Sequence, residues 1–148
     1  MPLRVDFYLV AGDARARDVA ACRIADKAWR EGHRVHLRTA NPEETARLDD
    51  LLWTFSDGAF VPHARAGLVR PGEAAPPVLV ADTEIDGDKA EAVLISLTDP
   101  VPESATQYAR VVEVVDADEA ARAGARERFK TYRAQGAVLQ THQLGGDS

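Results

Sequence analysis

Cysteine is almost absent from this chain of 148 residues. The single cysteine, Cys22, has no partner for an internal disulfide and no second thiolate with which to build a zinc site. It lies in a stretch with helical periodicity, so we expect a small core residue there. The chain is therefore not a disulfide-stabilised extracellular scaffold.

Long hydrophobic runs are also lacking. No apolar segment approaches the roughly 18 residues that a membrane span requires. The opening Met-Pro-Leu-Arg-Val-Asp carries charges where a signal peptide needs an apolar run. We therefore expect a cytoplasmic protein that does not associate with membranes.

The glycines of a phosphate-binding loop are missing as well. The first expected strand leads into Ala11-Gly12-Asp13-Ala14, which has one glycine where a dinucleotide fingerprint needs three. Gly87-Asp88-Lys89 lacks the upstream glycine and the following Ser or Thr of a Walker motif. We expect no cofactor, although a nucleotide-binding protein or enzyme of α/β class with a diverged phosphate loop stays open as the alternative.

No catalytic or metal-binding set emerges from the reactive residue types. His33 and His36 fall on an expected turn and strand, where they would diverge, so we interpret both as surface residues rather than metal ligands. Ser96 lies mid-strand without a nucleophile elbow. For His63, in a loop, a structural hydrogen-bonding role is the favoured interpretation. The sequence therefore predicts no catalytic residue and no metal site.

Runs of β-branched and aromatic residues alternate with segments of helical periodicity. Strands are expected at residues 4–10, 34–38, 77–81, 92–97, 111–115 and 137–144, and helices at 14–31, 42–52, 103–109 and 117–136. This alternation predicts a three-layer, Rossmann-like α/β fold with a mainly parallel twisted sheet. We expect one domain over residues 1–144, an exposed loop at 65–77 and a disordered tail at 145–148.

The helix expected at 117–136 carries a charge that opposes the rest of the chain. The protein has 18 Lys and Arg against 24 Asp and Glu, a net charge of -6. We expect Asp116 to cap the helix and Gly136 to end it. One stripe holds Ala121, Ala125, Phe129 and Tyr132, and the neighbouring one holds Arg122, Arg126, Lys130 and Arg133. An apolar edge beside a cationic one suits an acidic peptide with an apolar end, although a solvated charged face is the other interpretation.

Aromatic residues are few, at 6% of the chain, yet Trp53, Phe55 and Phe60 fall close together. Gly58 and Pro62 interrupt any regular element that could bury all three. At least one of these rings is therefore expected at the surface. An exposed aromatic in a turn is a candidate anchor for another protein, whereas packing beneath the loop is the alternative.

Several short segments together carry a family resemblance over almost the full length. They are Phe7-Tyr8-Leu9, Leu48-Asp49, Leu52-Trp53, Phe60-Val61-Pro62-His63, Ala66-Gly67, Val93-Leu94-Ile95-Ser96-Leu97, Arg126-Glu127-Arg128-Phe129-Lys130 and Tyr132-Arg133. In order and spacing the chain resembles the chi subunit of the bacterial DNA polymerase III clamp-loader assembly. The resemblance implies a non-enzymatic adaptor with a Rossmann-like fold that holds no nucleotide.

The resemblance also implies two partner sites. One would bind the acidic C-terminal tail of single-stranded DNA-binding protein, and its residues would be Arg122, Arg126, Phe129, Lys130 and Arg133. The other, at Trp53, Phe60, Val61 and Pro62, would bind the psi subunit of the clamp loader.

The chain departs from the family in one position, because members often carry Tyr where this sequence has Phe129. Since recognisable psi is less widespread than chi, a helicase is the other candidate partner of the second site. Direct nucleic-acid binding through the cationic stripe is not expected, because the stripe is short, the protein is acidic and aromatic residues are sparse.

Overall fold

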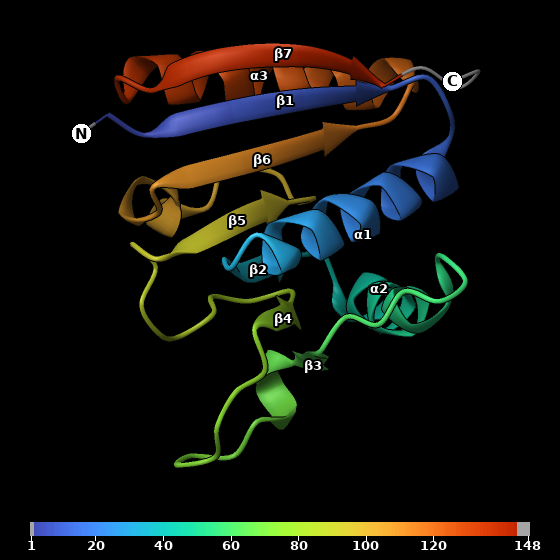
Figure 1. Cartoon of the computed structure of the whole chain (residues 1–148). Coiled ribbons are helices and arrows are strands. Elements are labelled where there is room, and N and C mark those ends of the chain that lie inside the picture. Colours follow the sequence, from blue (N-terminus) through green and yellow to red (C-terminus); the bar gives the residue numbers. More distant parts are fainter. Residues whose placement is uncertain (1, 145–148) are drawn as a thin grey trace.

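A seven-stranded parallel sheet forms the centre of the computed structural model, which describes residues 2–144. Its strands are β1 (Arg4–Val10), β2 (Arg34–Arg38), β3 (His63–Arg65), β4 (Val78–Ala81), β5 (Ala92–Ser96), β6 (Arg110–Val115) and β7 (Val138–Leu144), hydrogen-bonded in the order β3-β4-β2-β5-β6-β1-β7 (Figure 1). Every pair of neighbours is parallel. The expected α/β fold with a mainly parallel sheet is confirmed.

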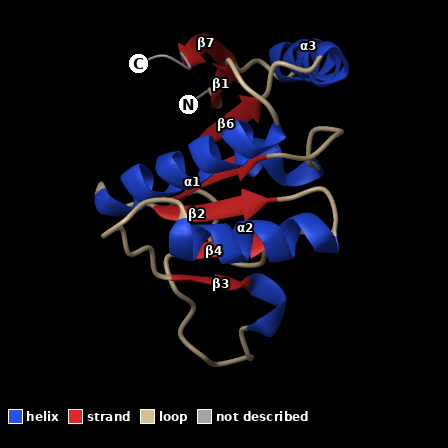
Figure 2. Cartoon of the chain, turned by 90° about the vertical axis from the view of Figure 1, so that its right-hand side faces the viewer, coloured by secondary structure: helices blue, strands red, loops and turns tan. Residues whose placement is uncertain are grey.

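Three α-helices cover the two faces of this sheet: α1 (Ala14–Arg30), α2 (Pro42–Thr54) and α3 (Glu119–Ala134). One hydrophobic cluster joins α1 and α2 to one face, and a second joins α3 to the other. Figure 2 shows α3 on the opposite side of the strands from α1. These layers give the Rossmann-like arrangement. None of the described helices is both long and apolar enough to span a membrane.

The first two helices begin at the residues that their sequence signals predict, whereas α1 ends one residue earlier and α2 two residues later than expected. Asp13 caps α1, and Asn41 caps α2 by accepting from the Glu44 backbone N–H at 2.8 Å, with Pro42 as the first helical residue. Cys22 lies on the core-facing side of α1 and is fully buried, as expected. The capping residues Asp13 and Asn41 therefore set the positions at which α1 and α2 begin.

Helix α3 begins later than predicted. Its cap is Asp118, whose carboxylate accepts from the Ala121 backbone N–H at 3.1 Å. Asp116, the expected cap, instead accepts from the backbone N–H of Asp118 at 3.0 Å. Either aspartate could accept a hydrogen bond from an unpaired backbone N–H of the first helical turn. Which of them caps the helix depends on the backbone conformation before it. Gly136 follows the helix with a φ of 81°, which confirms the predicted stop.

Two short elements differ from the sequence prediction. Strand β3 was not predicted, because its three residues are too few to show a period of two, and its last residue, Arg65, was expected in a loop. The segment Glu103–Gln107 is a 3-10 helix within the range expected as a helix. The tail expected at residues 145–148 lies outside the described part of the chain.

His36 was predicted at the surface and that prediction is wrong. Its side chain is buried in the sheet, with 3% of the residue exposed, and Nδ1 lies 2.6 Å from the phenol oxygen of Tyr108. Burial, with smaller contributions from the charges of Lys89 and Arg34, lowers the pKa of His36 to about 4. The ring is therefore a neutral core group at physiological pH.

Candidate functional site

A groove of about 460 Å³ lies between α3 and the edge of the sheet; we call it the α3 groove. Strands β1 and β7 contribute Phe7, Leu9 and Thr141. Helix α3 contributes Ala125 and all five residues predicted for the tail site, which are Arg122, Arg126, Phe129, Lys130 and Arg133. The structure thus brings these five side chains around one cavity.

The apolar part of the α3 groove is centred on Phe129. Its ring is half-buried and tilted against Phe7, with 5.5 Å between ring centroids. The guanidinium of Arg133 lies 5.9 Å from the centroid of the Phe129 ring, within cation–π range. Phe129 therefore offers part of its ring to a ligand while the rest is held by the core.

Tyr132 does not line this groove, although the sequence placed it on the same apolar stripe. It is fully buried, and its hydroxyl donates to the Glu113 carboxylate at 2.8 Å. Its ring packs against Phe7 of the sheet, with 5.9 Å between ring centroids, on the side of α3 that faces the strands. Its role is to attach the helix to the core.

Arg122 is held in place by backbone carbonyl groups. Its Nε donates to the Asp116 carbonyl oxygen at 2.7 Å and a terminal nitrogen donates to that of Val10 at 3.1 Å. No carboxylate within residues 2–144 forms an ion pair with it. The guanidinium is thus preorganised beside the groove with its charge uncompensated.

The remaining cations of the α3 groove reach into solvent. Arg126 and Arg133 form no ion pair with any described residue, whereas Lys130 pairs with Glu127 at 3.1 Å. That pair is exposed on both sides, so it adds little stability and yields readily to a competing anion. The groove therefore has a net excess of positive charge.

Arg128 belongs to the core side of α3. It contacts Glu113 at 3.1 Å and Asp99 at 3.3 Å. Burial raises the pKa of Glu113 to about 7, against the opposing effects of Arg128 and the Tyr132 hydrogen bond. Arg128 consequently offsets a buried carboxylate and is not available to a ligand in the groove.

A second feature is an exposed aromatic pair at the end of α2, which with Pro62 we call the aromatic surface. Trp53 is 56% exposed and Phe60 63% exposed. Their rings meet edge to face with centroids 6.0 Å apart. The prediction that at least one ring reaches the surface is confirmed. Adjacent large apolar side chains exposed to solvent are typical of surfaces that bind another molecule.

Val61 does not belong to the aromatic surface. The sequence placed it with Trp53, Phe60 and Pro62, but its side chain is 1% exposed and packs in the core. Successive side chains of this segment point to opposite sides, so that of Phe60 faces solvent and that of Val61 faces the core. Pro62 is half-buried at the edge of the pair.

His63 supports the aromatic surface from below. Its ring lies 4.6 Å from that of Trp53, and its nitrogens lie 2.7 Å from the Val61 carbonyl oxygen and 3.0 Å from that of Asp49. These contacts agree with the structural hydrogen-bonding role predicted for His63. They tie the loop that carries Phe60 to helix α2.

Gly12 lies in the turn after β1, where a phosphate-binding loop would be found, and its role here is in packing. A Cβ added to Gly12 would come within 2.7 Å of the Ala16 Cβ. The glycine therefore allows close contact between the turn and the first coil of α1. Among residues 2–144 no three His, Cys, Asp or Glu side chains are grouped as a metal site would need.

The parallel sheet, its layers and the two surfaces define an α/β protein of Rossmann-like fold with an apolar, cation-lined groove and a separate aromatic patch. The family model described as DNA polymerase III chi subunit, HolC, matches residues 2–140. The chain belongs to this family of replication accessory proteins.

Three relatives extend over nearly the whole chain. The DNA polymerase III subunit chi of Pseudomonas aeruginosa is 40% identical over 142 residues, covering 95% of this chain and 96% of its own. The Escherichia coli subunit is 34% identical over 140 residues, covering 91% and 94%. That of Haemophilus influenzae is 27% identical over 146 residues, covering 98% and 100%.

Proposed function

We propose that this protein is a non-catalytic adaptor of the DNA replication machinery. The α3 groove binds the acidic C-terminal tail of single-stranded DNA-binding protein. The aromatic surface binds the psi subunit of the clamp loader or, where psi is absent, a helicase. Together the two contacts link the clamp loader to coated single-stranded DNA.

The observation that carries this proposal is the α3 groove itself. An apolar floor at Phe129, Phe7 and Leu9 suits the terminal Phe of the tail, and the surrounding cations suit its aspartates. Arg122 is already positioned by two carbonyl groups, so less side-chain entropy is lost when it meets a carboxylate. A groove of this kind selects a short acidic peptide end.

The aromatic surface supports the second half of the proposal. Trp and other large aromatic residues dominate the binding energy of protein interfaces. Trp53 and Phe60 are exposed, are held by His63 and lie on a different element from the α3 groove. Two partners could therefore bind at the same time.

Calorimetric titration with a synthetic tail peptide, ending in Phe after a run of aspartates, tests the proposed tail site. Arg126→Ala and Lys130→Ala should each weaken binding by about 1 to 3 kcal/mol through loss of a charge-assisted contact. The loss should shrink at high salt, because the contacts are exposed.

Arg30→Ala is the matched control. It removes an exposed cation from α1, where Arg30 pairs with Asp26 at 3.0 Å, outside the groove. Tail affinity should stay at the wild-type value in this variant. Unchanged affinity in both Arg126→Ala and Lys130→Ala would contradict the site.

A further inference from the structure

The described residues leave the face of the sheet opposite α3 only partly covered at β1 and β7. Helix α1 follows β1 but leads to β2, which lies beyond β6 and β5 in the sheet. The helix therefore crosses β6 and β5 and covers β1 and the edge strand β7 only in part (Figure 1). On the other face the same two strands are covered by α3. Within residues 2–144 no helix occupies the position beside α1 in this layer.

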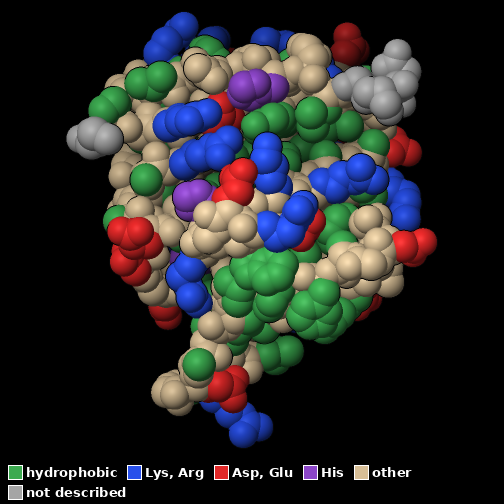
Figure 3. Space-filling model, viewed as in Figure 1, with side chains coloured by type: hydrophobic (Ala, Val, Ile, Leu, Met, Phe, Trp, Pro, Cys, Tyr) green, Lys and Arg blue, Asp and Glu red, His purple; other side chains and the backbone are tan. Residues whose placement is uncertain are grey.

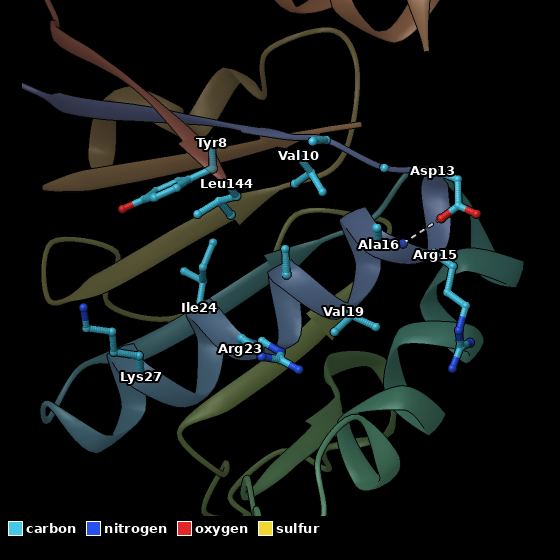
Figure 4. Close-up of a pocket in the computed structure, with 13 residues that line it drawn as sticks. Tyr8, Val10, Asp13, Arg15, Ala16, Val19, Arg23, Ile24, Lys27 and Leu144 are labelled. Atoms are coloured by element: carbon cyan, nitrogen blue, oxygen red, sulfur yellow. Dashed lines mark hydrogen bonds between the residues drawn. The ribbon is translucent and has the colours of Figure 1, made fainter. Parts of the chain in front are cut away.

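A groove of about 700 Å³ occupies this position; we call it the α1 groove. Tyr8, Val10 and Leu144 line it from the strands, and Val19 and Ile24 from α1. Figure 4 shows Tyr8 and Leu144 facing Ile24 across the gap. The floor is aliphatic apart from the single aromatic ring.

Three cations on α1 form the rim of the α1 groove: Arg15, Arg23 and Lys27. All three are exposed, and none forms an ion pair with another residue in the described chain. At 1.5 Å per residue Arg23 and Lys27 are about 6 Å apart along the helix, and Arg15 lies about 12 Å from Arg23 and about 80° further round the helix axis. In Figure 3 Lys and Arg side chains surround the hydrophobic area between β1 and α1.

A second cationic group borders the same face. His142 stacks on Tyr8 at 4.6 Å and contacts the buried Asp6, which also pairs with Arg110 at 3.0 Å and Arg4 at 3.1 Å. Burial acts to raise the pKa of Asp6, but the His142 and Arg110 hydrogen bonds together with the charges of Arg110 and Arg4 outweigh it and lower that pKa. One carboxylate thus faces two guanidinium groups, so this border too carries excess positive charge.

We propose that the α1 groove docks an amphipathic α-helix of a partner protein. Its apolar stripe lies on the half-buried side chains of Tyr8 and Leu144 and against Ile24 of α1. Its acidic edge faces Arg15, Arg23 and Lys27. The site lies on the opposite face of the sheet from the α3 groove, so it goes beyond the function proposed above.

The layer geometry favours a helix as the occupant. A helix packed on β1 and β7 beside α1 would complete the helical layer that covers the rest of this face. Carboxylates at i and i+4 of such a helix repeat at about 6 Å, the spacing of Arg23 and Lys27. The charge of the occupant follows from the cations, which have no acidic partner within the described chain.

The same floor disfavours nucleic acid. Single-stranded DNA is held by successive aromatic rings on which bases stack. Here the one aromatic ring, Tyr8, already has a face against His142, and the other side chains of the floor, such as Leu144 and Ile24, are aliphatic. The α1 groove therefore fits a protein partner better than a DNA strand.

The probe is a labelled, end-blocked peptide of about 18 residues, long enough to form a helix, with Leu along one stripe and Glu along the flank beside it. Fluorescence anisotropy gives its affinity for the full-length protein. The double variant Arg23→Glu with Lys27→Glu should weaken binding about tenfold or more. Arg30→Glu with Arg70→Glu makes the same change in charge at exposed residues outside both grooves and should leave binding unchanged.

Three results would overturn the proposal. The first is equal affinity for a control peptide with Lys in place of every Glu. The second is stronger binding of single-stranded oligo(dT), lost in the Arg23→Glu and Lys27→Glu variant, which would assign the face to nucleic acid. The third is a wild-type dimer in sedimentation that the same variant dissociates, which would assign it to a second copy of this chain.

Discussion

Phe129 packs against Phe7 and also lines the α3 groove, so it joins the protein core to the proposed tail site. Phe129→Ala should weaken tail-peptide binding by about 1.5 to 3 kcal/mol, because the apolar floor loses an aromatic side chain. Phe129→Tyr keeps the ring and should preserve the affinity. Calorimetry measures both.

The matched control for that prediction is Phe60→Ala, which removes the same ring from the aromatic surface. Tail affinity should be unaffected there. Equal losses in Phe60→Ala and Phe129→Ala would mean that a general loss of stability, not the groove, determines binding; thermal melts of both variants measure that loss directly.

His36 supplies a pH-dependent contribution to stability. Its pKa is about 4 in the folded protein and about 6.5 when unfolded, so the unfolded state takes up the proton first as the pH falls. The contribution is present above pH 6.5 and is lost as the pH falls toward 4. The difference in unfolding free energy between wild type and His36→Gln should therefore decrease by roughly 2 to 3 kcal/mol between pH 7 and pH 4.

Wild type and His36→Gln must be compared because Glu113 also makes stability depend on pH. Its folded pKa is raised to about 7, so its contribution has the opposite sign and is lost as the pH rises from 4.5 through 7. It is present in both proteins and cancels in the difference. A difference that stays constant over this range in urea titrations would contradict the neutral, buried state of His36.

At the scale of the element, α3 is fixed to the sheet through a buried polar contact. Tyr132→Phe removes the hydroxyl that donates to Glu113 at 2.8 Å and leaves a buried carboxyl group with one donor fewer. We expect a loss of about 1 to 2 kcal/mol in unfolding free energy. Denaturant titration at pH 8, where Glu113 is ionised, should show the larger loss, and no loss at that pH would refute this role.

The end of α3 gives a backbone prediction. Gly136 has a φ of 81° and open space around its Cα, so an added Cβ is strained by the backbone alone. Gly136→Ala should lower the unfolding free energy by about 1 kcal/mol. Gly67→Ala, at a glycine without positive φ or close neighbours, is the control and should be nearly neutral in the same thermal melts.

Elements with strong local signals could be predicted from the sequence. The strands at residues 4–10 and 34–38 were placed at their observed bounds, because turns and charged residues delimit their apolar runs. Strand β3 could not be predicted, since its three residues form a strand only by pairing with the distant β4. The start of α3 was misplaced because two aspartates compete as the cap.

In the candidate sites too, local features could be predicted from the sequence and features that depend on tertiary packing could not. Helical periodicity placed the cations and Phe129 on adjacent stripes, which is a local property. The buried positions of Val61 and His36 depend on what packs against them, and periodicity does not contain that information. The α1 groove was missed because its walls, Tyr8 and Leu144 with α1, come together only in the folded sheet.

At the scale of the whole molecule, the proposed tail site and the aromatic surface lie on separate elements, α3 and the end of α2. Trp53→Ala should abolish capture of psi and leave tail-peptide affinity unchanged, whereas Arg126→Glu should do the reverse. Pull-down and calorimetry on the same two variants measure both. Loss of both partners in either variant would contradict two independent surfaces.

The central claim is that the α3 groove takes the acidic tail, and amide chemical-shift mapping by NMR tests it most directly. On addition of the tail peptide, shifts should concentrate at Phe7, Leu9 and Thr141 on the strands and at Arg126 and Phe129 on α3. Shifts confined to the aromatic surface or the α1 groove, with these five amides unmoved, would contradict the account.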